Sequence, residues 1–316
     1  MKGLQLIATG GALPGRLVTN EDLSQLVDTS DEWITTRTGI RQRHFCAEGE
    51  TATTLAVAAA RQALARSGLA PEQIGCCVCG TLSAQYATPS TACLVQKELG
   101  LPQDIPVLDV NAACSGFIYG AGVARGLLAM RENDPRRYAL VIGCEQLSRL
   151  MEMTDRSTCV LFGDGAGAAV FELTEDDGFA IDLGARGDMA ITTPAGGPIG
   201  MDGRAVFRFA VDALPRTLHA VLEASGKTLE ELDWVVCHQA NSRIIDHCVK
   251  KLGADPAKFY KNMDRHGNTS AASIPVALNE LAEQGRLTPG MRIACIGFGG
   301  GLTWGGMLIT VKGRAV

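Results

Sequence analysis

Apolar runs of strand length alternate with segments of helical periodicity along the first half of the chain. The strand-like runs, which are almost continuously apolar, cover residues 4–10, 74–82, 105–110, 138–145 and 158–163. Apolar residues three or four positions apart predict helices over residues 54–68, 90–100 and 115–131. Buried strands that alternate with helices indicate an α/β fold, with a mostly parallel sheet covered by helices on both faces.

The second half of the chain repeats this plan. "IGCCVCGTL" precedes a helix ending in "KELG", and "LDWVVCHQ" precedes a helix ending in "KKLG". Cys114 lies 29 positions before Gly143, and Asn268 lies 29 positions before Gly297. The spacings predict a duplication into residues 1–172 and 173–316, with Cys114 and Asn268 at the same topological point of the two halves.

Composition narrows the class of protein. The 316 residues suffice for one large domain or two smaller ones; 46% are hydrophobic, 20% are charged, and the net charge of -5 shows no bias toward nucleic acid. The first residues lack the features of a signal peptide, and no apolar run approaches the roughly 18 residues of a membrane helix. We therefore expect a cytoplasmic protein without membrane or nucleic-acid partners.

The chain has 11 cysteines. Their odd number and irregular spacing argue against a disulfide framework. Cys76 and Cys79 form a C-x-x-C pair, but this pair lies in an apolar run and has no second pair to complete a metal site. We expect most of these cysteines to pack as small buried side chains, without a metal.

Cys114 differs from the others because "VLDVNAACSGFIYG" reads as a strand that runs straight into a helix. The helix N-terminus favours an anion, so it should lower the pKa of the thiol and supply a thiolate near neutral pH. A small core residue is the alternative interpretation. The position at the strand-to-helix junction favours a nucleophile.

One of the five histidines, His238, ends a strand and is followed by polar "QAN". A histidine that leaves a strand into a cleft is suited to act as an acid, a base or a hydrogen-bond donor. We expect packing or surface positions for the others, with His266 bracing the loop beside Asn268; these are His44, His219, His247 and His266. The glycine-rich turn 297–306 lacks the lysine of a phosphate loop, but its backbone N–H groups could stabilise an oxyanion.

Several motifs together resemble one known family. "DTSDEWITTRTGIRQRH", "NAACSGF", "FGDGAGAAV", "HQAN", "RHGNTSAAS" and "GFGGGLTWG" occur in the order seen in β-ketoacyl-acyl-carrier-protein synthase III, of the thiolase superfamily. The resemblance spans essentially the whole chain. It implies a five-layered αβαβα fold of two similar halves related by a pseudo-two-fold axis, and a homodimer.

The resemblance also implies a reaction. Cys114 would take an acyl group from a short acyl-CoA such as acetyl-CoA, and His238 and Asn268 would complete the triad. Malonyl-acyl carrier protein would then be decarboxylated and condensed with that acyl group, which initiates fatty acid biosynthesis. The N–H groups of Cys114 and Gly300 would form the oxyanion hole. No metal, flavin or nicotinamide cofactor is implied.

The same resemblance implies binding residues for coenzyme A. Trp33 and Arg149 would flank the adenine, and Arg37 would help to bind phosphate. Arg204 and Phe207 would face the site. Without the resemblance, Trp33 reads as an ordinary amphipathic anchor.

Arg243, Lys250 and Lys251 would share one helix face and form the docking site for the acidic carrier protein. A solvated helix face is the alternative. The segment 184–207, which helps to form the entrance and the acyl pocket, is shorter than in typical members. This difference leaves the acyl specificity open.

Three other functions compete with this interpretation. A thiolase would need a second cysteine beside the glycine triplet, where this chain has Phe298, and a histidine in place of Asn268. A related condensing enzyme of secondary metabolism would use the same triad with another acyl donor or acceptor. A non-catalytic partner subunit would have lost the nucleophile, whereas Cys114 and His238 are both present.

Overall fold

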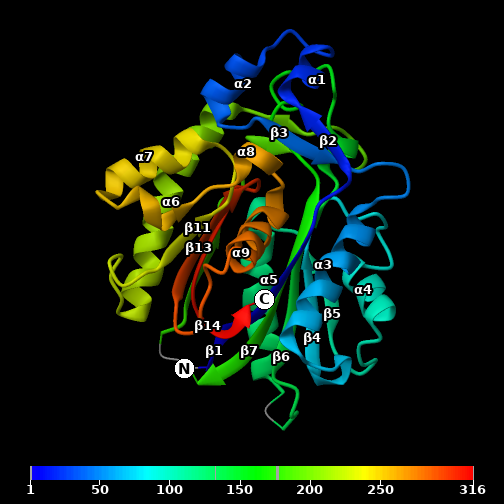
Figure 1. The fold of residues 1–316 in the computed structure, drawn as a ribbon, viewed down its shortest axis with the longest axis vertical. Helices are drawn as coiled ribbons and strands as arrows, with labels where there is room; N and C mark the ends of the chain where they lie inside the picture. Colours follow the sequence, from blue (N-terminus) through cyan, green and yellow to red (C-terminus); the bar gives the residue numbers. More distant parts are fainter. Residues whose placement is uncertain (1, 132, 176–177, 316) are drawn as a thin grey trace.

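A ten-stranded sheet that divides into two halves of five strands forms the framework of the molecule (Figure 1). The computed structural model describes residues 2–131, 133–175 and 178–315. The first half-sheet has the order β1-β7-β6-β4-β5, from β1 (Lys2–Ala12), β7 (Gly165–Glu175), β6 (Tyr138–Glu145), β4 (Ile74–Gly80) and β5 (Val107–Val110). The second has the order β8-β14-β13-β11-β12, from β8 (Ala180–Ala185), β14 (Thr303–Ala315), β13 (Arg292–Gly299), β11 (Trp234–Cys237) and β12 (Phe259–Tyr260).

The two half-sheets share their pairing directions. β7 is antiparallel to β1 and β6, and β14 is antiparallel to β8 and β13. The remaining pairs within each half are parallel, as is the β1–β14 pair that joins them. The sheet is therefore mixed: five of its strand pairs are parallel, as expected, and four are antiparallel because β7 and β14 run against their neighbours.

Helices form three layers around the two half-sheets. The central layer is α5 (Gly116–Ala129) and α9 (Ser273–Glu283), which contact strands of both half-sheets. α3 (Ala52–Ser67) and α4 (Thr91–Leu99) cover the outer face of the first half-sheet, and α6 (Gly203–Ser225) and α7 (Ser242–Leu252) lie outside the second. The layer order is thus αβαβα, as the family resemblance predicted.

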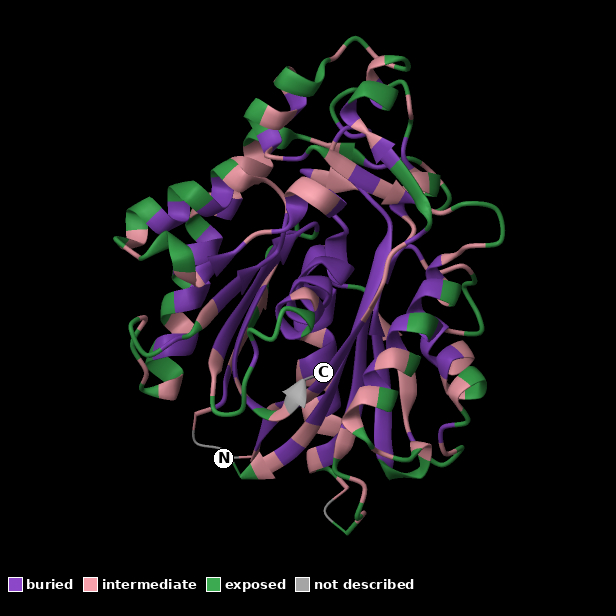
Figure 2. Ribbon diagram, in the orientation of Figure 1, coloured by how far each residue is buried: buried purple, intermediate pink, exposed green. Residues whose placement is uncertain are grey.

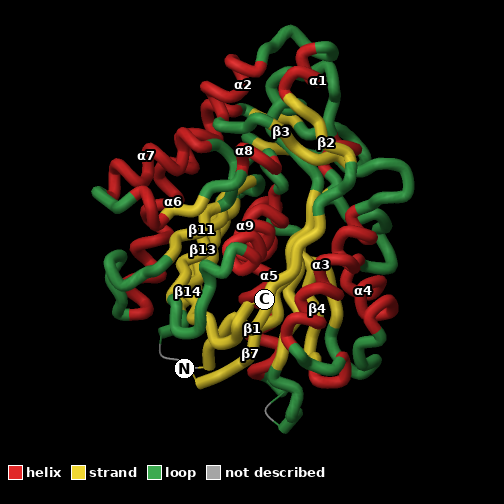
Figure 3. Tube along the Cα trace, in the orientation of Figure 1, coloured by secondary structure: helices red, strands yellow, loops and turns green. Residues whose placement is uncertain are grey.

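Shorter elements surround this framework. α1 (Asn20–Ser24), α2 (Asp31–Thr38) and the hairpin of β2 (Arg16–Thr19) and β3 (Gln42–Phe45) form an extension at the top of Figures 1 and 3. The others are α8 (Met263–His266), the hairpin of β9 (Ile191–Thr192) and β10 (Gly200–Met201), and the 3-10 turns η1 (Pro71–Gln73), η2 (Ala113–Ser115), η3 (Leu147–Leu150), η4 (Pro256–Lys258) and η5 (Ser270–Ala272). Among the described helices, none combines the length and the apolar character needed to cross a bilayer.

Local sequence sets where the helices begin and end. The Thr51 hydroxyl accepts the Thr54 N–H at the start of α3, and Gly68 ends that helix at φ 69°. At α7, the Asn241 side chain accepts the Arg243 N–H, and Gly253 ends the helix at φ 62°. Polar N-caps satisfy backbone donors that the first helical turn leaves unpaired, and glycine adopts the left-handed conformation at little cost.

Small residues let the layers approach closely. Every residue of β4 is buried, including Cys76, Cys77 and Cys79, and Figure 2 shows buried residues filling the strands and the central helices. A Cβ atom at Gly10 in β1 would lie 2.2 Å from the Ala59 carbonyl oxygen of α3. Burial of the three cysteines agrees with their predicted packing role.

Residues 158–163 form turns instead of the predicted strand. The Asp155 carboxylate holds the start of the segment by accepting hydrogen bonds from the Ser157 N–H and the Thr158 hydroxyl. Phe162 makes only a single β-bridge, to Asn268. The apolar run is therefore buried by packing under the loops of the site and not by pairing in the sheet.

Candidate active site

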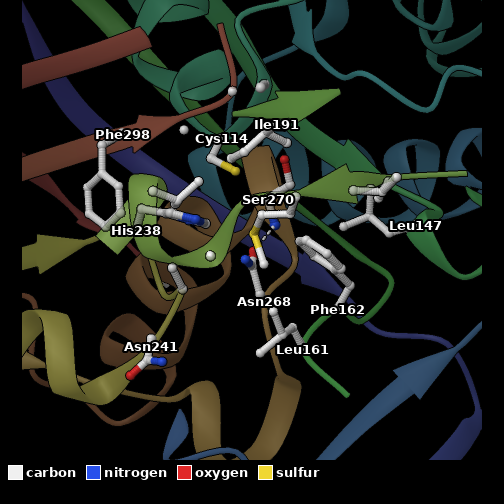
Figure 4. A pocket seen from close by; sticks show the side chains of 18 of the residues that line it. Cys114, Leu147, Leu161, Phe162, Ile191, His238, Asn241, Asn268, Ser270 and Phe298 are labelled. Atoms are coloured by element: carbon white, nitrogen blue, oxygen red, sulfur yellow. Dashed lines mark hydrogen bonds between the residues drawn. The ribbon is translucent and has the colours of Figure 1, made fainter. Parts of the chain in front are cut away.

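The three predicted catalytic residues line one cavity between the two half-sheets (Figure 4). Cys114 comes from the turn before α5, His238 from the end of β11, and Asn268 from the loop before α9. Their side chains point into the same space in Figure 4. Most of the remaining wall is apolar and includes Leu147, Phe162, Ile191, Ile199, Val206 and Phe298.

Cys114 lies in the turn η2 directly before α5, so the predicted strand-to-helix position is confirmed. Ala113, the preceding residue, has φ 45°. The backbone of β13 closes over the cysteine so tightly that a Cβ atom at Gly299 would lie 2.7 Å from the Cys114 Cβ and 2.9 Å from its Sγ. Glycine is required at position 299 for this approach.

Burial raises the pKa of the Cys114 thiol to about 12. The Ser270 hydroxyl and the backbone N–H groups of Cys114 and Gly300 act against this effect, whereas the Glu145 carboxyl adds to it. The predicted lowering of the thiol pKa by the helix N-terminus is therefore wrong for this buried thiol. Desolvation favours the neutral thiol more strongly than the helix end favours the thiolate.

His238 is held by a hydroxyl group at its inner nitrogen. Its Nδ1 lies 2.8 Å from the Ser273 Oγ, which also accepts the Gln239 N–H at 3.4 Å. The Ser273 hydroxyl can donate its hydrogen to Nδ1, and in that tautomer the proton of the ring is on Nε2. Burial lowers the pKa of His238 to about 3, so the ring is a neutral donor.

Asn268 is fixed through both its backbone and its side chain. Its N–H donates to the Leu161 carbonyl at 2.9 Å, and its carbonyl accepts the Gly163 N–H at 3.0 Å. Its Oδ1 accepts the Ser270 N–H at 2.9 Å. The amide NH₂ is thus directed into the cavity, where it can donate hydrogen bonds at any pH.

The two strand-to-helix junctions correspond to each other with a different register from the predicted one. Asn111 accepts the Ala113 N–H just as Asn268 accepts the Ser270 N–H. Ala113 and Ser270 are the two described non-glycine residues with positive φ, at 45° and 48°. Asn268 therefore matches Asn111, and Cys114 matches Ala271; the expected equivalence of Cys114 and Asn268 was wrong.

A basin rich in arginine opens beside the cavity and shares Ser157, Leu161 and Phe207 with it. The Trp33 ring lies at its wall, with the guanidinium carbons of Arg37 and Arg156 at 4.4 and 4.9 Å from the ring centroid. We call it the arginine basin, because its charged lining residues are all arginines, namely Arg37, Arg156, Arg204, Arg208 and Arg243. Such a surface attracts phosphate groups.

Arg149 does not take part in this basin. Its guanidinium donates to the carbonyl oxygens of Ser83 and Ala84, at 2.9 and 2.5 Å. The expected position beside Trp33 is occupied by Arg156, which the sequence analysis missed. Both arginines lie in the same irregular segment, and no periodicity distinguishes the one that faces Trp33.

The other predicted binding residues lie near the entrance or on the surface. Arg204 and Phe207 line the arginine basin from the first turns of α6. Arg243, Lys250 and Lys251 are exposed on α7, which buries Ile244, Ile245, Cys248 and Val249 on its other face. Within segment 184–207, the β9–β10 hairpin region supplies Ile191, Ile199 and Met201 to the cavity wall.

The remaining histidines have structural surroundings. His266 Nε2 lies 2.7 Å from the Glu280 carboxylate, which agrees with a bracing role for this residue. His44 Nδ1 lies 2.9 Å from the Pro14 carbonyl oxygen, while His219 and His247 are exposed. Cys295 is fully buried in β13 and does not line the cavity.

Comparison with known proteins points to one family over the whole chain. Residues 108–187 match the family model of 3-oxoacyl-[acyl-carrier-protein] synthase III, and residues 222–311 match the model of its C-terminal part. The beta-ketoacyl-[acyl-carrier-protein] synthase III of Natranaerobius thermophilus is 43% identical, covering 98% of this chain and 99% of the relative. That of Rhizobium meliloti is 45% identical, covering 95% and 97%.

Solved structures agree with these sequence relatives. The crystal structure of 3-oxoacyl-[acyl-carrier-protein] synthase III from Aquifex aeolicus has a TM-score of 0.90 and 44% identity, covering 97% of this chain and 99% of that one. The priming beta-ketosynthase from the R1128 polyketide biosynthetic pathway has a TM-score of 0.91 and 33% identity, covering 99% and 97%.

Proposed function

Because the chain belongs to the β-ketoacyl-[acyl-carrier-protein] synthase III family, we propose that it condenses a short acyl-CoA, such as acetyl-CoA, with malonyl-acyl carrier protein and so initiates fatty acid synthesis. The observation that carries this proposal is the convergence of Cys114, His238 and Asn268 on one cavity beside the arginine basin. The product is a 3-oxoacyl chain on the carrier protein.

Cys114 is the proposed nucleophile of the first half-reaction. Its sulfur attacks the thioester carbonyl, coenzyme A leaves, and one thioester replaces another. The backbone N–H groups of Cys114 and Gly300 are directed at the Cys114 sulfur and lower its pKa. They therefore lie where they can donate to the oxyanion of the tetrahedral intermediate. Since the thiol is neutral at rest, it must lose its proton as the carbon–sulfur bond forms.

His238 and Asn268 are the proposed donors of the second half-reaction. Loss of CO₂ from the malonyl group leaves an enolate, whose oxygen accepts hydrogen bonds from His238 Nε2 and the Asn268 amide. A neutral ring suits this role, because a proton on Nε2 can be donated and burial keeps the ring free of a charge that would have to be solvated. The enolate carbon then attacks the acyl thioester on Cys114.

The arginine basin is the proposed site of coenzyme A. The adenine would stack at Trp33, and the guanidinium groups of Arg37, Arg156 and Arg204 would contact phosphate, with Phe207 between the basin and the cavity. This assignment replaces Arg149 with Arg156. No metal or redox cofactor is needed for the reaction.

Arg243, Lys250 and Lys251 on α7 are the proposed docking residues for the carrier protein. Arg243 also lines the arginine basin, so the exposed basic face of α7 is continuous with the entrance. Positive charge beside an entrance steers an acidic partner toward it, even though the chain as a whole is acidic.

We also propose a homodimer, a cytoplasmic location and two equivalent halves, residues 1–172 and 173–316. Support for the halves comes from the matched strand orders, although β7 continues to Glu175. Support for a dimer comes from β5, whose residues are all half-buried and which lies at the end of the sheet, where a second strand could pair.

A condensing enzyme of secondary metabolism is the second candidate. It is supported by the likeness to the R1128 priming ketosynthase and by the short segment 184–207, which forms part of the cavity wall. The triad would be unchanged, and the acyl donor or the acceptor would differ.

Mass spectrometry of the intact protein tests both candidates. After mixing with acetyl-CoA, we expect an acetyl adduct on the wild type and none on Cys114→Ala, followed by 3-oxoacyl product when malonyl-acyl carrier protein is added. Acylation only by other acyl-CoA thioesters, or transfer only to another acceptor, would support the second candidate. An unmodified Cys114 with every donor of an acyl-CoA panel would overturn both.

A further inference from the structure

The junction that matches the nucleophile turn has an alanine in place of the thiol and packs against a strand that ends in an acid, Glu145. Ala271 occupies the position of Cys114 in the second half, and each junction packs against a strand end of the opposite half. Cys114 packs against Gly299, the last residue of β13, whereas η5, which includes Ala271, packs against the end of β6, whose last residue is Glu145. Relative to Ala271, Glu145 therefore has the position that Gly299 has relative to Cys114.

Close backbone contacts fix this correspondence. A Cβ atom at Gly143 in β6 would lie 2.1 Å from the Ala271 carbonyl oxygen. A Cβ atom at Gly297 in β13 would lie 3.4 Å from the Cys114 carbonyl oxygen. Two residues further along each strand come Glu145 and Gly299, so the Glu145 side chain stands beside η5 at the position where β13 has only a glycine beside Cys114.

The Glu145 carboxyl is fully buried and is surrounded by donors. It accepts hydrogen bonds from the Ser83 hydroxyl at 2.5 Å, from the Leu82 N–H at 3.3 Å and from the Thr81 hydroxyl at 3.3 Å. The Ala271 N–H also lowers the pKa of the Glu145 carboxyl. Among the described residues no cation forms an ion pair with Glu145, so the group can exchange a proton without breaking a salt bridge.

The Ser270 hydroxyl lies between this carboxyl and the nucleophile. It is buried, lines the cavity, and has no hydrogen-bond partner among the described residues. Its turn η5 packs against η2, which carries Cys114, and against β6, which ends at Glu145, and the hydroxyl lowers the pKa of both groups. A buried hydroxyl without a fixed partner is free to turn from one group to the other.

We propose that Glu145 stores the proton of Cys114 between acylation and condensation, and that the Ser270 hydroxyl passes this proton in both directions. The proposal rests on the proposed function. In acylation, the S–H proton goes to the Ser270 oxygen, the Ser270 proton goes to the Glu145 carboxylate, and the sulfur forms its bond to the acyl carbon. Coenzyme A leaves as a thiolate and takes a proton from solvent.

The proton returns in the second half-reaction. When the enolate attacks the acyl group, Cys114 leaves as a thiolate, and the Glu145 carboxylic acid returns the proton through Ser270. One solvent proton is consumed in each cycle, as the conversion of malonyl carboxylate and acyl-CoA to CO₂ and free coenzyme A requires. Glu145 is thus a positioning residue for the proton, and it is neutral while the enolate forms nearby.

The protonation range of Glu145 suits this exchange. Burial raises its pKa to about 7, with the surrounding donors acting in the opposite direction. The other ionisable groups on the neighbouring elements are engaged elsewhere. Asp164 accepts the N–H groups of Cys46 and Ser148, Arg149 donates to carbonyl groups, His238 is bonded to Ser273, and the Cys79 and Cys144 thiols contact each other.

Pre-steady-state acylation between pH 5.5 and 9, followed by intact-protein mass spectrometry, tests the relay. The wild-type rate should rise through an inflection near pH 7, because the acceptor must be ionised. Glu145→Gln and Ser270→Ala should each slow acylation on the order of 100-fold and remove the inflection. Ser83→Ala, which removes the hydroxyl donor at 2.5 Å from the carboxyl, should keep the fast limb and move the inflection up by about one pH unit.

A purely electrostatic role gives the opposite result. If Glu145 acted only by raising the thiol pKa, Glu145→Gln would speed acylation, and this outcome would overturn the proposal. Infrared spectroscopy supplies a second readout: acylation of the wild type at pH 8 should produce a protonated-carboxyl band that Glu145→Gln lacks. A wild type that is acylated without this band would also overturn the proposal, whereas a wild type that no acyl-CoA acylates would refute the proposed function itself.

Discussion

Substitution of Gly299 by alanine tests how tightly the nucleophile is held. The new methyl carbon would lie 2.7 Å from the Cys114 Cβ, 2.9 Å from its Sγ and 3.1 Å from its backbone nitrogen. Non-bonded carbon atoms rest at about 3.5 Å or more, so one of the two elements must move by roughly 0.8 Å. β13 is held on both sides by β11 and β14, whereas Cys114 lies in a short turn.

The expected cost falls mainly on catalysis. A displacement of about 1 Å at a reacting atom can lower the rate on the order of 100-fold, and we expect this loss in the acylation rate of Gly299→Ala. Overpacking of a tight core typically costs about 1–3 kcal/mol, so the variant should remain folded. Quench-flow acylation with acetyl-CoA and urea unfolding measure the two effects separately.

Gly126→Ala is the matched control on the helix that follows the nucleophile. Nothing lies within 4 Å of a Cβ atom at Gly126, so this variant should be acylated at the wild-type rate and gain about 0.5–1 kcal/mol of stability. A folded Gly299→Ala that is acylated as fast as the wild type would refute the argument that this contact positions Cys114.

Three further predictions concern the surroundings of the site. Arg156→Ala should raise the KM for acyl-CoA roughly 10-fold with little change in kcat, and Arg149→Ala should leave KM nearly unchanged. Steady-state kinetics measures both effects, and the reverse result would contradict the assignment of Arg156 to the arginine basin. Ser273→Ala removes the hydroxyl beside Nδ1 of His238, which favours the tautomer with the proton on Nε2. The rate of CO₂ release from malonyl-acyl carrier protein should therefore fall on the order of 10-fold while acylation persists. An unchanged rate of decarboxylation would show that Ser273 does not set the tautomer. Burial tends to raise the pKa of Glu280, but hydrogen bonds and charge, chiefly from His266, lower it to about 2. A carboxylate whose pKa is depressed in the native state stabilises the fold above its ordinary pKa of 4.5 and loses this contribution as the pH falls toward 2. The urea midpoint should therefore decrease over that range, and less steeply in Glu280→Gln; identical profiles would show that Glu280 contributes nothing to acid stability.

The sequence was sufficient to predict the layers and the three residues of the cavity. Alternating apolar runs and helical periods report burial directly, and the continuous run of β4 is buried at every position. The junction before α5 was recognisable because a strand, a small-residue turn and a helix follow one another within "VLDVNAACSGFIYG". These are local patterns, and the fold keeps them except in the apolar run 158–163, which forms turns.

Features that depend on distant contacts could not be predicted in the same way. The high pKa of Cys114 comes from its burial in the closed cavity, against a β13 residue that is remote in sequence. The predicted match of Cys114 with Asn268 was wrong by three residues. The reason is that the path from the start of α5 at Gly116 to the start of β6 at Tyr138 is longer than the path from the start of α9 at Ser273 to the start of β13 at Arg292. Equal spacings between Cys114 and Gly143 and between Asn268 and Gly297 were therefore coincidental.

The burial of Cys114 also bears on survival in an oxidising cell. Peroxides and alkylating agents attack the thiolate, and burial raises the pKa of the Cys114 thiol so that the neutral form dominates at pH 7. Cys114 should therefore react slowly with small oxidants before a substrate binds. The sulfur reacts with a molecule that enters the cavity and places a carbonyl group beside it. The same desolvation therefore protects the thiol from oxidation and selects the substrate.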